Sequence, residues 1–254
     1  MKIAKELLLT IGLLAAGSIL FAQQQSVKKS NSNNNETETS VENEYLNDVD
    51  GDIIMSLANS DDLDNKLVAL QYLKSAIEEG NTSDTVIRAL DQLAGEGLFT
   101  QSTTKGRVMN NFPEIRREAC LLMAKVPTEH SKNTLISVVV ADNEPMVMAA
   151  AVKSLGVIGI NNNDETVEAI AFANRRNQVL NPTGSLALEV INTFEMLADS
   201  TENKKSMIDA LTRISSDYHY VTPVRQRAQK LLKKLSNSAN QSQSGKKSST
   251  VDAK

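Results

Sequence analysis

The amino-acid sequence predicts an all-α fold of repeated antiparallel helix pairs over residues 45–235. Three observations support this prediction. Four of the five prolines stand before long runs with helical periodicity, namely Pro113, Pro145, Pro182 and Pro223, and proline is favoured at the first position of a helix. Each run places four apolar residues at the same spacing of 0, +4, +8 and +11, which brings them to one helix face. The runs start 32, 39 and 38 residues apart, which is close to the length of a two-helix repeat.

The four runs share one apolar frame without exception. Its members are Ile115, Ala119, Met123 and Val126; Val147, Ala151, Leu155 and Ile158; Leu186, Val190, Phe194 and Leu197; and Val224, Ala228, Leu232 and Leu235. A buried face of this kind needs neighbouring helices to cover it. We therefore expect each run to form the second helix of a pair and to face the core.

The segments between these runs predict the first helix of each pair. Their helices are expected to start near Ser83, Thr128, Asp164 and Thr201, all of which are residue types that cap helix N-termini. An additional pair is expected at residues 45–58 and 63–79, with a less regular frame, as terminal repeats that cap a stack often have. The prediction is ten helices in five antiparallel pairs.

Three of the four runs carry a more specific pattern, one of them with a substitution. The segments Ile115-Arg116-x-x-Ala119 and Val224-Arg225-x-x-Ala228 resemble the second-helix signature of HEAT repeats, and Val147-Met148-x-x-Ala151 resembles it with methionine at the basic position. The resemblance implies a right-handed α-solenoid whose second helices line a concave face, and a role in scaffolding or protein binding. In this family the arginine usually bonds acidic groups between repeats, which implies structural roles for Arg116 and Arg225.

The two ends of the chain differ from the middle. Residues 1–22 are expected to be a signal peptide, because Lys2 and Lys5 precede an apolar stretch at 7–21 that is shorter than the about 20 residues of a membrane span. Cleavage would make the protein periplasmic or secreted, whereas a retained segment would anchor it to the membrane. Residues 23–44 and 236–254 are expected to be a disordered linker and tail, because they are polar and have few apolar residues.

One interval departs from the repeat and is a candidate for partner binding. Residues 98–112 show no helical period, and long loops inside compact repeats are often functional. Lys105 and Arg107 make the segment basic, while Phe99, Met109 and Phe112 could act as apolar anchors. The alternative is a structural insert that packs over the first two repeats.

A second candidate is the segment Tyr218-His219-Tyr220, which holds two of the four tyrosines of the chain. Exposed aromatic side chains can anchor a partner protein. The same residues could instead cover the end of the last repeat.

Composition and motifs argue against an enzyme, a metal site or a bound cofactor. The chain has two histidines and one cysteine, Cys120, which lies in an apolar run and is expected to be a buried small hydrophobe. The formal net charge of −4 disfavours nucleic-acid binding. We therefore expect an exported protein-binding scaffold of the cell envelope, with a structural component that self-associates as the alternative.

Overall fold

The computed structural model describes the backbone of residues 41–247 and the side chains of residues 50–237. Within this part of the chain it contains ten α-helices, a single turn of 3-10 helix and one short β-hairpin. The predicted all-α class is therefore confirmed. The predicted signal peptide, most of the predicted linker and residues 248–254 lie outside the described residues.

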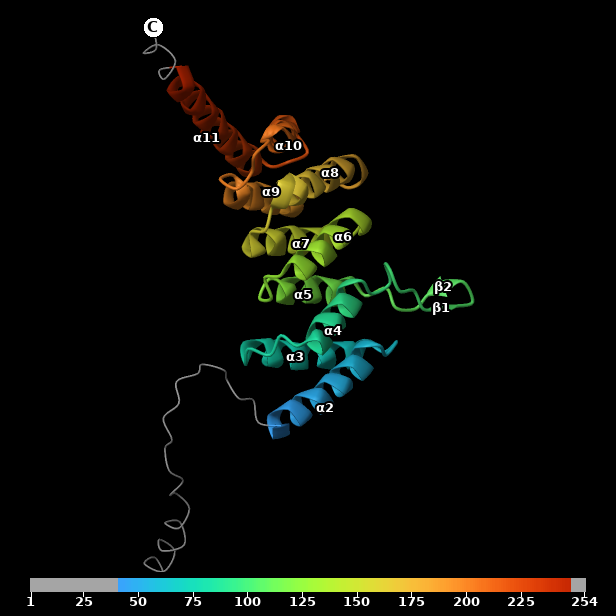
Figure 1. Cartoon of the computed structure of the whole chain (residues 1–254). Helices are drawn as coiled ribbons and strands as arrows, with labels where there is room; N and C mark the ends of the chain where they lie inside the picture. The colour runs from blue at the N-terminus through green and yellow to red at the C-terminus, as the bar shows by residue number, and fades with distance from the viewer. Residues whose placement is uncertain (1–40, 248–254) are drawn as a thin grey trace, which may run out of the picture. The chain divides into compact units, whose positions relative to one another are not determined.

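The helices follow one another through short connections, except between α4 and α5, where residues 95–112 intervene (Figure 1). Their bounds are α2 (Val41–Ala58), α3 (Leu63–Glu78), α4 (Asp84–Ala94), α5 (Pro113–Met123), α6 (Glu129–Ala141), α7 (Pro145–Ile158), α8 (Glu165–Leu180), α9 (Gly184–Leu197), α10 (Lys205–Ser216) and α11 (Thr222–Lys247). The 3-10 turn Asn162–Asp164 precedes α8, and strands β1 (Thr103–Thr104) and β2 (Arg107–Val108) lie between α4 and α5.

Two predicted boundaries differ from the structure. Helix α2 begins at Val41, inside the expected linker, and α11 continues to Lys247, through most of the expected disordered tail. No proline follows Pro223, and residues 236–247 consist mainly of Ser, Asn, Gln and Lys. Extending an existing helix needs only one further residue to be fixed for each hydrogen bond, so a polar segment can continue a helix that the core has nucleated.

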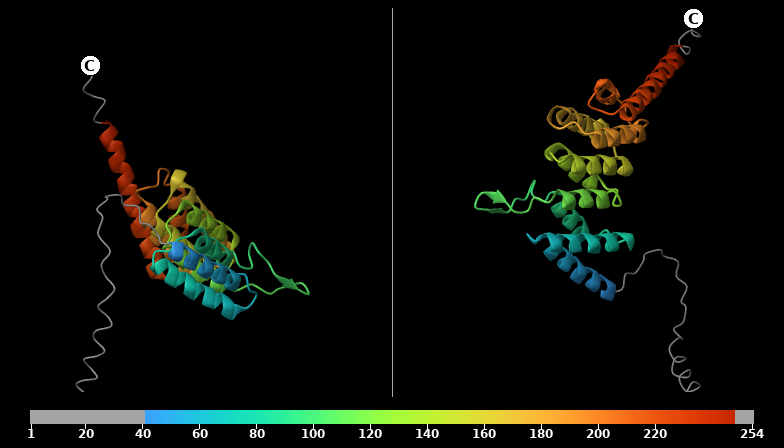
Figure 2. Two further views of the ribbon diagram at one scale, coloured as in Figure 1. Left: turned by 60° about the horizontal axis from the view of Figure 1, so that its bottom comes forward. Right: turned by 180° about the vertical axis from the view of Figure 1, so that it is seen from behind.

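The helices form two layers by alternation (Figure 2). In one layer α3 contacts α5, α5 contacts α7, α7 contacts α9, and α9 contacts α11. In the other layer α4 contacts α6, α6 contacts α8, and α8 contacts α10. Helix α2 belongs beside α4, because a Cβ added at its Gly51 would lie 3.0 Å from Cγ2 of Thr85. Each helix thus packs mainly on the helices one and two places away in the sequence.

The core between the layers is built from the predicted apolar frame. Every member of the four runs is buried except Leu232, which is partly buried and packs against the core. Complete burial of one such aliphatic or aromatic side chain contributes roughly 1.5–3 kcal/mol. The prediction for Cys120 is also confirmed: the side chain is fully buried, and burial raises the pKa of its thiol to about 12.

Buried polar contacts add links between successive helix pairs. The carboxylate of Asp164, before α8, accepts hydrogen bonds from the backbone N–H groups of Glu202 and Asn203 at 2.9 and 2.7 Å. Those two residues precede α10, so the contact ties one pair to the next. Because an unpaired buried carboxylate would be costly, such a contact also fixes how the two pairs fit together.

Candidate functional site

The irregular segment 98–112 contains a β-hairpin that the sequence analysis did not predict. Strands β1 and β2 are antiparallel, with Thr103 opposite Val108 and Thr104 opposite Arg107. The connecting residues Lys105 and Gly106 both have positive φ, 51° and 77°. A two-residue turn with positive φ at both positions matches the right-handed twist of the flanking strands. Figure 1 shows the hairpin extending away from the helices between α4 and α5.

The base of the hairpin is held by side-chain hydrogen bonds. Asn110 is buried, donates from Nδ2 to the carbonyl of Thr100 at 2.7 Å and accepts the Ser102 N–H at 2.8 Å. The Met109 N–H also donates to the carbonyl of Ser102, at 2.8 Å. The Ser102 hydroxyl in turn donates to the carboxylate of Asp61 at 3.0 Å, which connects the hairpin to the start of α3.

Gly97 lets the chain cross closely at this base. Its φ is +71°, and a Cβ at this position would lie 2.6 Å from the carbonyl oxygen of Asn110 and 2.9 Å from Cα of Asn111. Only glycine has no side chain to clash there and reaches positive φ without steric cost. The two ends of the excursion can therefore meet at this point.

Beneath the hairpin lie two buried ion pairs. Lys66 Nζ is 2.8 Å from Glu96 Oε2 and also donates to the carbonyl of Ala58 at 2.8 Å. Arg116 pairs with Asp142, with Nε 2.7 Å from Oδ2 and Nη2 3.3 Å from Oδ1. Buried charges are tolerated when they are paired and hydrogen-bonded in this way.

Arg116 joins the hairpin base to the helix layers. Its Nη1 donates to the carbonyl of Glu96 at 3.1 Å and to Oδ1 of Asn111 at 2.8 Å, so both ends of the excursion are fixed by one guanidinium group. The predicted structural role of Arg116 is confirmed. Arg225 differs: its guanidinium lies over the ring of Tyr218, 4.7 Å from the centroid, and donates to Thr222 Oγ1.

The predicted contact residues of this segment separate into two groups. Lys105, Arg107, Phe99 and Met109 are exposed, with 56% of Phe99 and 47% of Met109 accessible to solvent. Phe112 is partly buried and packs against the core at the N-cap position of α5, so less of its side chain is open to a partner. Its role as a contact residue stays a prediction.

The second predicted segment separates in the same way. Tyr218 is 86% exposed and His219 is exposed, with its backbone N–H and Nδ1 both bonded to Asp217 Oδ1. The N–H of His219 helps to hold the pKa of Asp217 below its usual value. Tyr220 is only 3% exposed and belongs to the core, and burial raises its pKa to about 12. Tyr220 is therefore not available to a partner.

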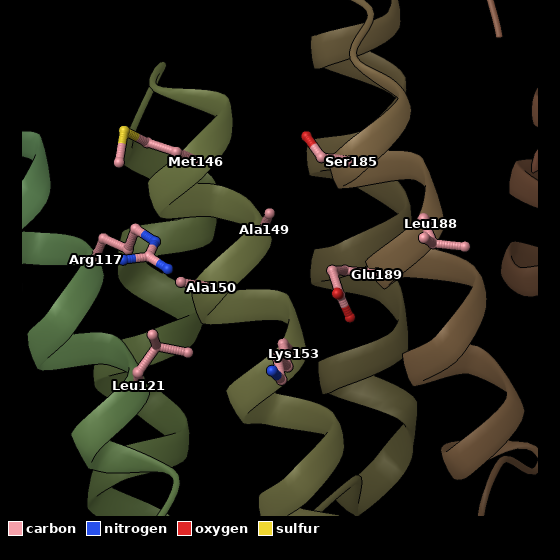
Figure 3. Close-up of a pocket in the computed structure, with 9 residues that line it drawn as sticks. All are labelled: Arg117, Leu121, Met146, Ala149, Ala150, Lys153, Ser185, Leu188 and Glu189. Atoms are coloured by element: carbon pink, nitrogen blue, oxygen red, sulfur yellow. The ribbon is translucent and has the colours of Figure 1, made fainter. Parts of the chain in front are cut away.

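Sequence reasoning missed a pocket on the face of α5, α7 and α9. The pocket has a volume of about 300 Å³. Figure 3 shows its nine lining side chains on three adjacent helices. The apolar members are Leu121, Met146, Ala149, Ala150 and Leu188, and the polar members are Arg117, Lys153, Ser185 and Glu189.

The lining residues lie outside the apolar frame but at equivalent positions relative to it. Arg117, Ala149 and Leu188 each lie two residues after the first frame residue of their run. Leu121 and Lys153 each lie six residues after it. This recurrence is the signal that could have identified the pocket, since equal positions of stacked repeats fall on one surface.

The same layer of helices carries a second hollow at α11, the last described helix. This hollow, of about 540 Å³, lies between α9 and α11 and is lined by Glu195, Gln226, Arg227, Lys230, Leu231 and Lys234. Glu195 lies 3.8 Å from Arg227 and 3.6 Å from Lys234. Three basic side chains of α11, those of Arg227, Lys230 and Lys234, therefore border this hollow.

The described residues lack two further kinds of feature. Within residues 41–247 no helix is long and apolar enough to cross a membrane. In the same part of the chain, no three His, Cys, Asp or Glu side chains are grouped as a metal ion would need.

Comparison with known proteins gave no match, whether to a protein-family model, to a curated protein or to a solved structure. The resemblance to HEAT repeats therefore rests on the spacing of the apolar frame and on the motif residues quoted above.

Proposed function

We propose that this chain is an exported scaffold or adaptor that binds a protein partner on the second-helix face of a HEAT-like α-solenoid. The observation that carries the proposal is the pocket on α5, α7 and α9, because its lining residues lie at equivalent positions relative to the apolar frame in these three helices. Equivalent positions on stacked helix pairs form a continuous surface, along which an extended partner segment can bind.

The alternating contacts support the solenoid arrangement. Five pairs, from α2 with α3 to α10 with α11, would each contribute one helix to each layer. In such an array each pair contacts only its neighbours and leaves one long face open. Right-handedness remains what the HEAT resemblance implies.

The chemistry of the pocket suits a peptide or protein surface. Its floor combines Leu121 and Leu188 with the small side chains of Ala149 and Ala150, which allow close approach of a partner. Arg117, Lys153 and Glu189 provide charges of both signs at the border, where they can select a partner by complementarity. Export to the periplasm or beyond rests on the predicted signal peptide, and we propose no enzymatic activity.

Filling the pocket should abolish partner binding. We expect Ala149→Trp to block the floor and to reduce recovery of the partner about tenfold or more in a pull-down of the tagged chain from native cells, as loss of a central contact does at protein interfaces. Val157→Trp is the matched control, because Val157 is exposed on the same helix and does not line the pocket. Equal recovery with both variants would show that the pocket does not bind the partner.

The alternative function is a structural component that self-associates. Its supporting observation is the exposed apolar surface of the first two helices, where Ile53, Leu67, Val68 and Tyr72 are 38–52% accessible. Sedimentation equilibrium of the purified chain separates the two proposals. A mass that rises with concentration would favour self-association, whereas a constant monomer mass would favour the adaptor.

A further inference from the structure

Among the described residues, the strands of the hairpin 102–109 pack on no helix, and Ser102 at its base joins it to Asp61 before α3. Strands β1 and β2 contact one another and no helix, while the hairpin base is fixed to the core through Asn110 and Arg116. A structural insert would be expected to cover the helices, but this one is held away from them. A rigid base with an exposed end is the arrangement expected of a recognition element.

The charge of the segment is opposite to that of the chain. Residues 98–112 contain Lys105 and Arg107 and no acidic residue, whereas the whole chain has a formal net charge of −4. Both cations lie at or next to the turn and are exposed, and neither is within ion-pair distance of a carboxylate whose side chain the structure describes. The tip of the hairpin is therefore suited to a negatively charged surface.

Lys105 occupies a backbone conformation that disfavours it. Its φ is +51°, a region in which glycine or asparagine is the common choice for the first turn position. Asparagine would form the same turn at lower cost. The presence of lysine at this position is therefore better explained by its charge than by the turn.

Apolar surface accompanies the charge on one side of the hairpin. Met109 directly follows β2, and its N–H donates to the carbonyl of Ser102, as the next residue of an antiparallel ladder would. Because successive residues of an extended chain point to opposite faces, we expect Arg107 and Met109 to share one face and Val108 to lie on the other. Met109 is 47% exposed even though its N–H is bonded to Ser102 at the base. This face presents a flexible apolar side chain next to a cation.

We propose that the Arg107–Met109 face and Lys105 dock into an apolar cleft bordered by carboxylates on the protein partner. This inference rests on the proposed function and specifies the chemical character of the partner's binding surface. The observations favour a protein over a lipid bilayer, because Lys105 and Gly106 form a polar tip and the apolar side chains lie further back.

The test uses the full-length chain and a random peptide library displayed on phage. We expect wild-type protein to enrich peptides that combine several Asp or Glu residues with aliphatic or aromatic ones. The double variant Lys105→Glu, Arg107→Glu should instead enrich basic peptides, because complementary charge selects the partner. Lys105→Asn should preserve the hairpin and yet bind the wild-type peptides roughly fivefold to tenfold more weakly, because one favourable charge contact is lost.

Two controls test whether peptide binding depends on the Arg107–Met109 face of the hairpin and whether it is independent of the helix-face pocket. Met109→Ser should weaken binding of the selected peptides, whereas Val108→Ser, on the other face, should leave it nearly unchanged. Ala149→Trp should also leave it unchanged, so failure at the helix-face pocket and failure at the hairpin can be told apart.

Three results would overturn the inference. The first is enrichment of the same peptides by the wild type and the charge-reversed variant. The second is equal loss of binding with Met109→Ser and Val108→Ser. The third is co-sedimentation with phosphatidylcholine vesicles containing one quarter phosphatidylglycerol that depends on Lys105 and Arg107, which would make the hairpin a membrane contact.

Discussion

Replacing Arg116 with alanine should destabilise the protein by about 3–5 kcal/mol, the typical cost of removing one partner of a buried ion pair. The change leaves the Asp142 carboxylate buried without its cation, and it also removes the donor shared by Glu96 and Asn111. Because a domain is often stable by only about 5–15 kcal/mol, the variant should unfold at a markedly lower denaturant concentration. Urea titration followed by circular dichroism measures the change.

The next residue provides a matched control. Arg117 is the same residue type in the same helix turn, but its side chain is 42% exposed and pairs with the exposed Glu118. We expect Arg117→Ala to change stability by no more than about 0.5 kcal/mol. Replacing both members of the buried pair with apolar residues, as in Arg116→Met with Asp142→Leu, should recover part of the loss. Equal effects of Arg116→Ala and Arg117→Ala would contradict the assigned role.

Gly97→Ala should cost about 2–3 kcal/mol, because strained positive φ and a steric clash act together. The added Cβ would lie 2.6 Å from the carbonyl oxygen of Asn110, and backbone there must move to relieve it. That movement breaks the hairpin base, so the variant should also lose hairpin-dependent peptide binding. The free energy of unfolding and hydrogen exchange of the Ser102 and Met109 amides, both bonded in the base, report the two effects.

Gly106→Ala separates the two contributions. Gly106 has a similar φ of +77°, but a Cβ there would meet nothing within 4 Å. Its cost should be limited to about 1–2 kcal/mol of backbone strain. A Gly106→Ala variant as destabilised as Gly97→Ala would mean that the close crossing at Gly97 contributes nothing.

The helices could be predicted because their signals are local. A spacing of 0, +4, +8 and +11 identifies one helix face without knowledge of any neighbour, and those residues form the core. The burial of the Phe112 and Tyr220 side chains could not be predicted in this way. Whether a loop aromatic is exposed depends on which helices it folds against, and both side chains turn inward.

The hairpin and the pocket were not predicted from the sequence, for different physical reasons. Lys105-Gly106 is a weak hairpin signal, because lysine seldom adopts the positive φ that asparagine accepts more readily. The pocket depends on side chains that are more than 30 residues apart in sequence, such as Arg117, Ala149 and Leu188. Their common frame position becomes meaningful only once the helices are seen side by side.

Binding of a protein partner to the face of α5, α7 and α9 is tested most directly by site-specific photocrosslinking in native cells, with benzoylphenylalanine in place of Leu188 in the pocket. Glu168, exposed on α8 in the other layer, is the control position. The proposal predicts one recurrent crosslinked protein from position 188 and none from position 168. Crosslinks only between copies of the chain, or the same products from both positions, would contradict it.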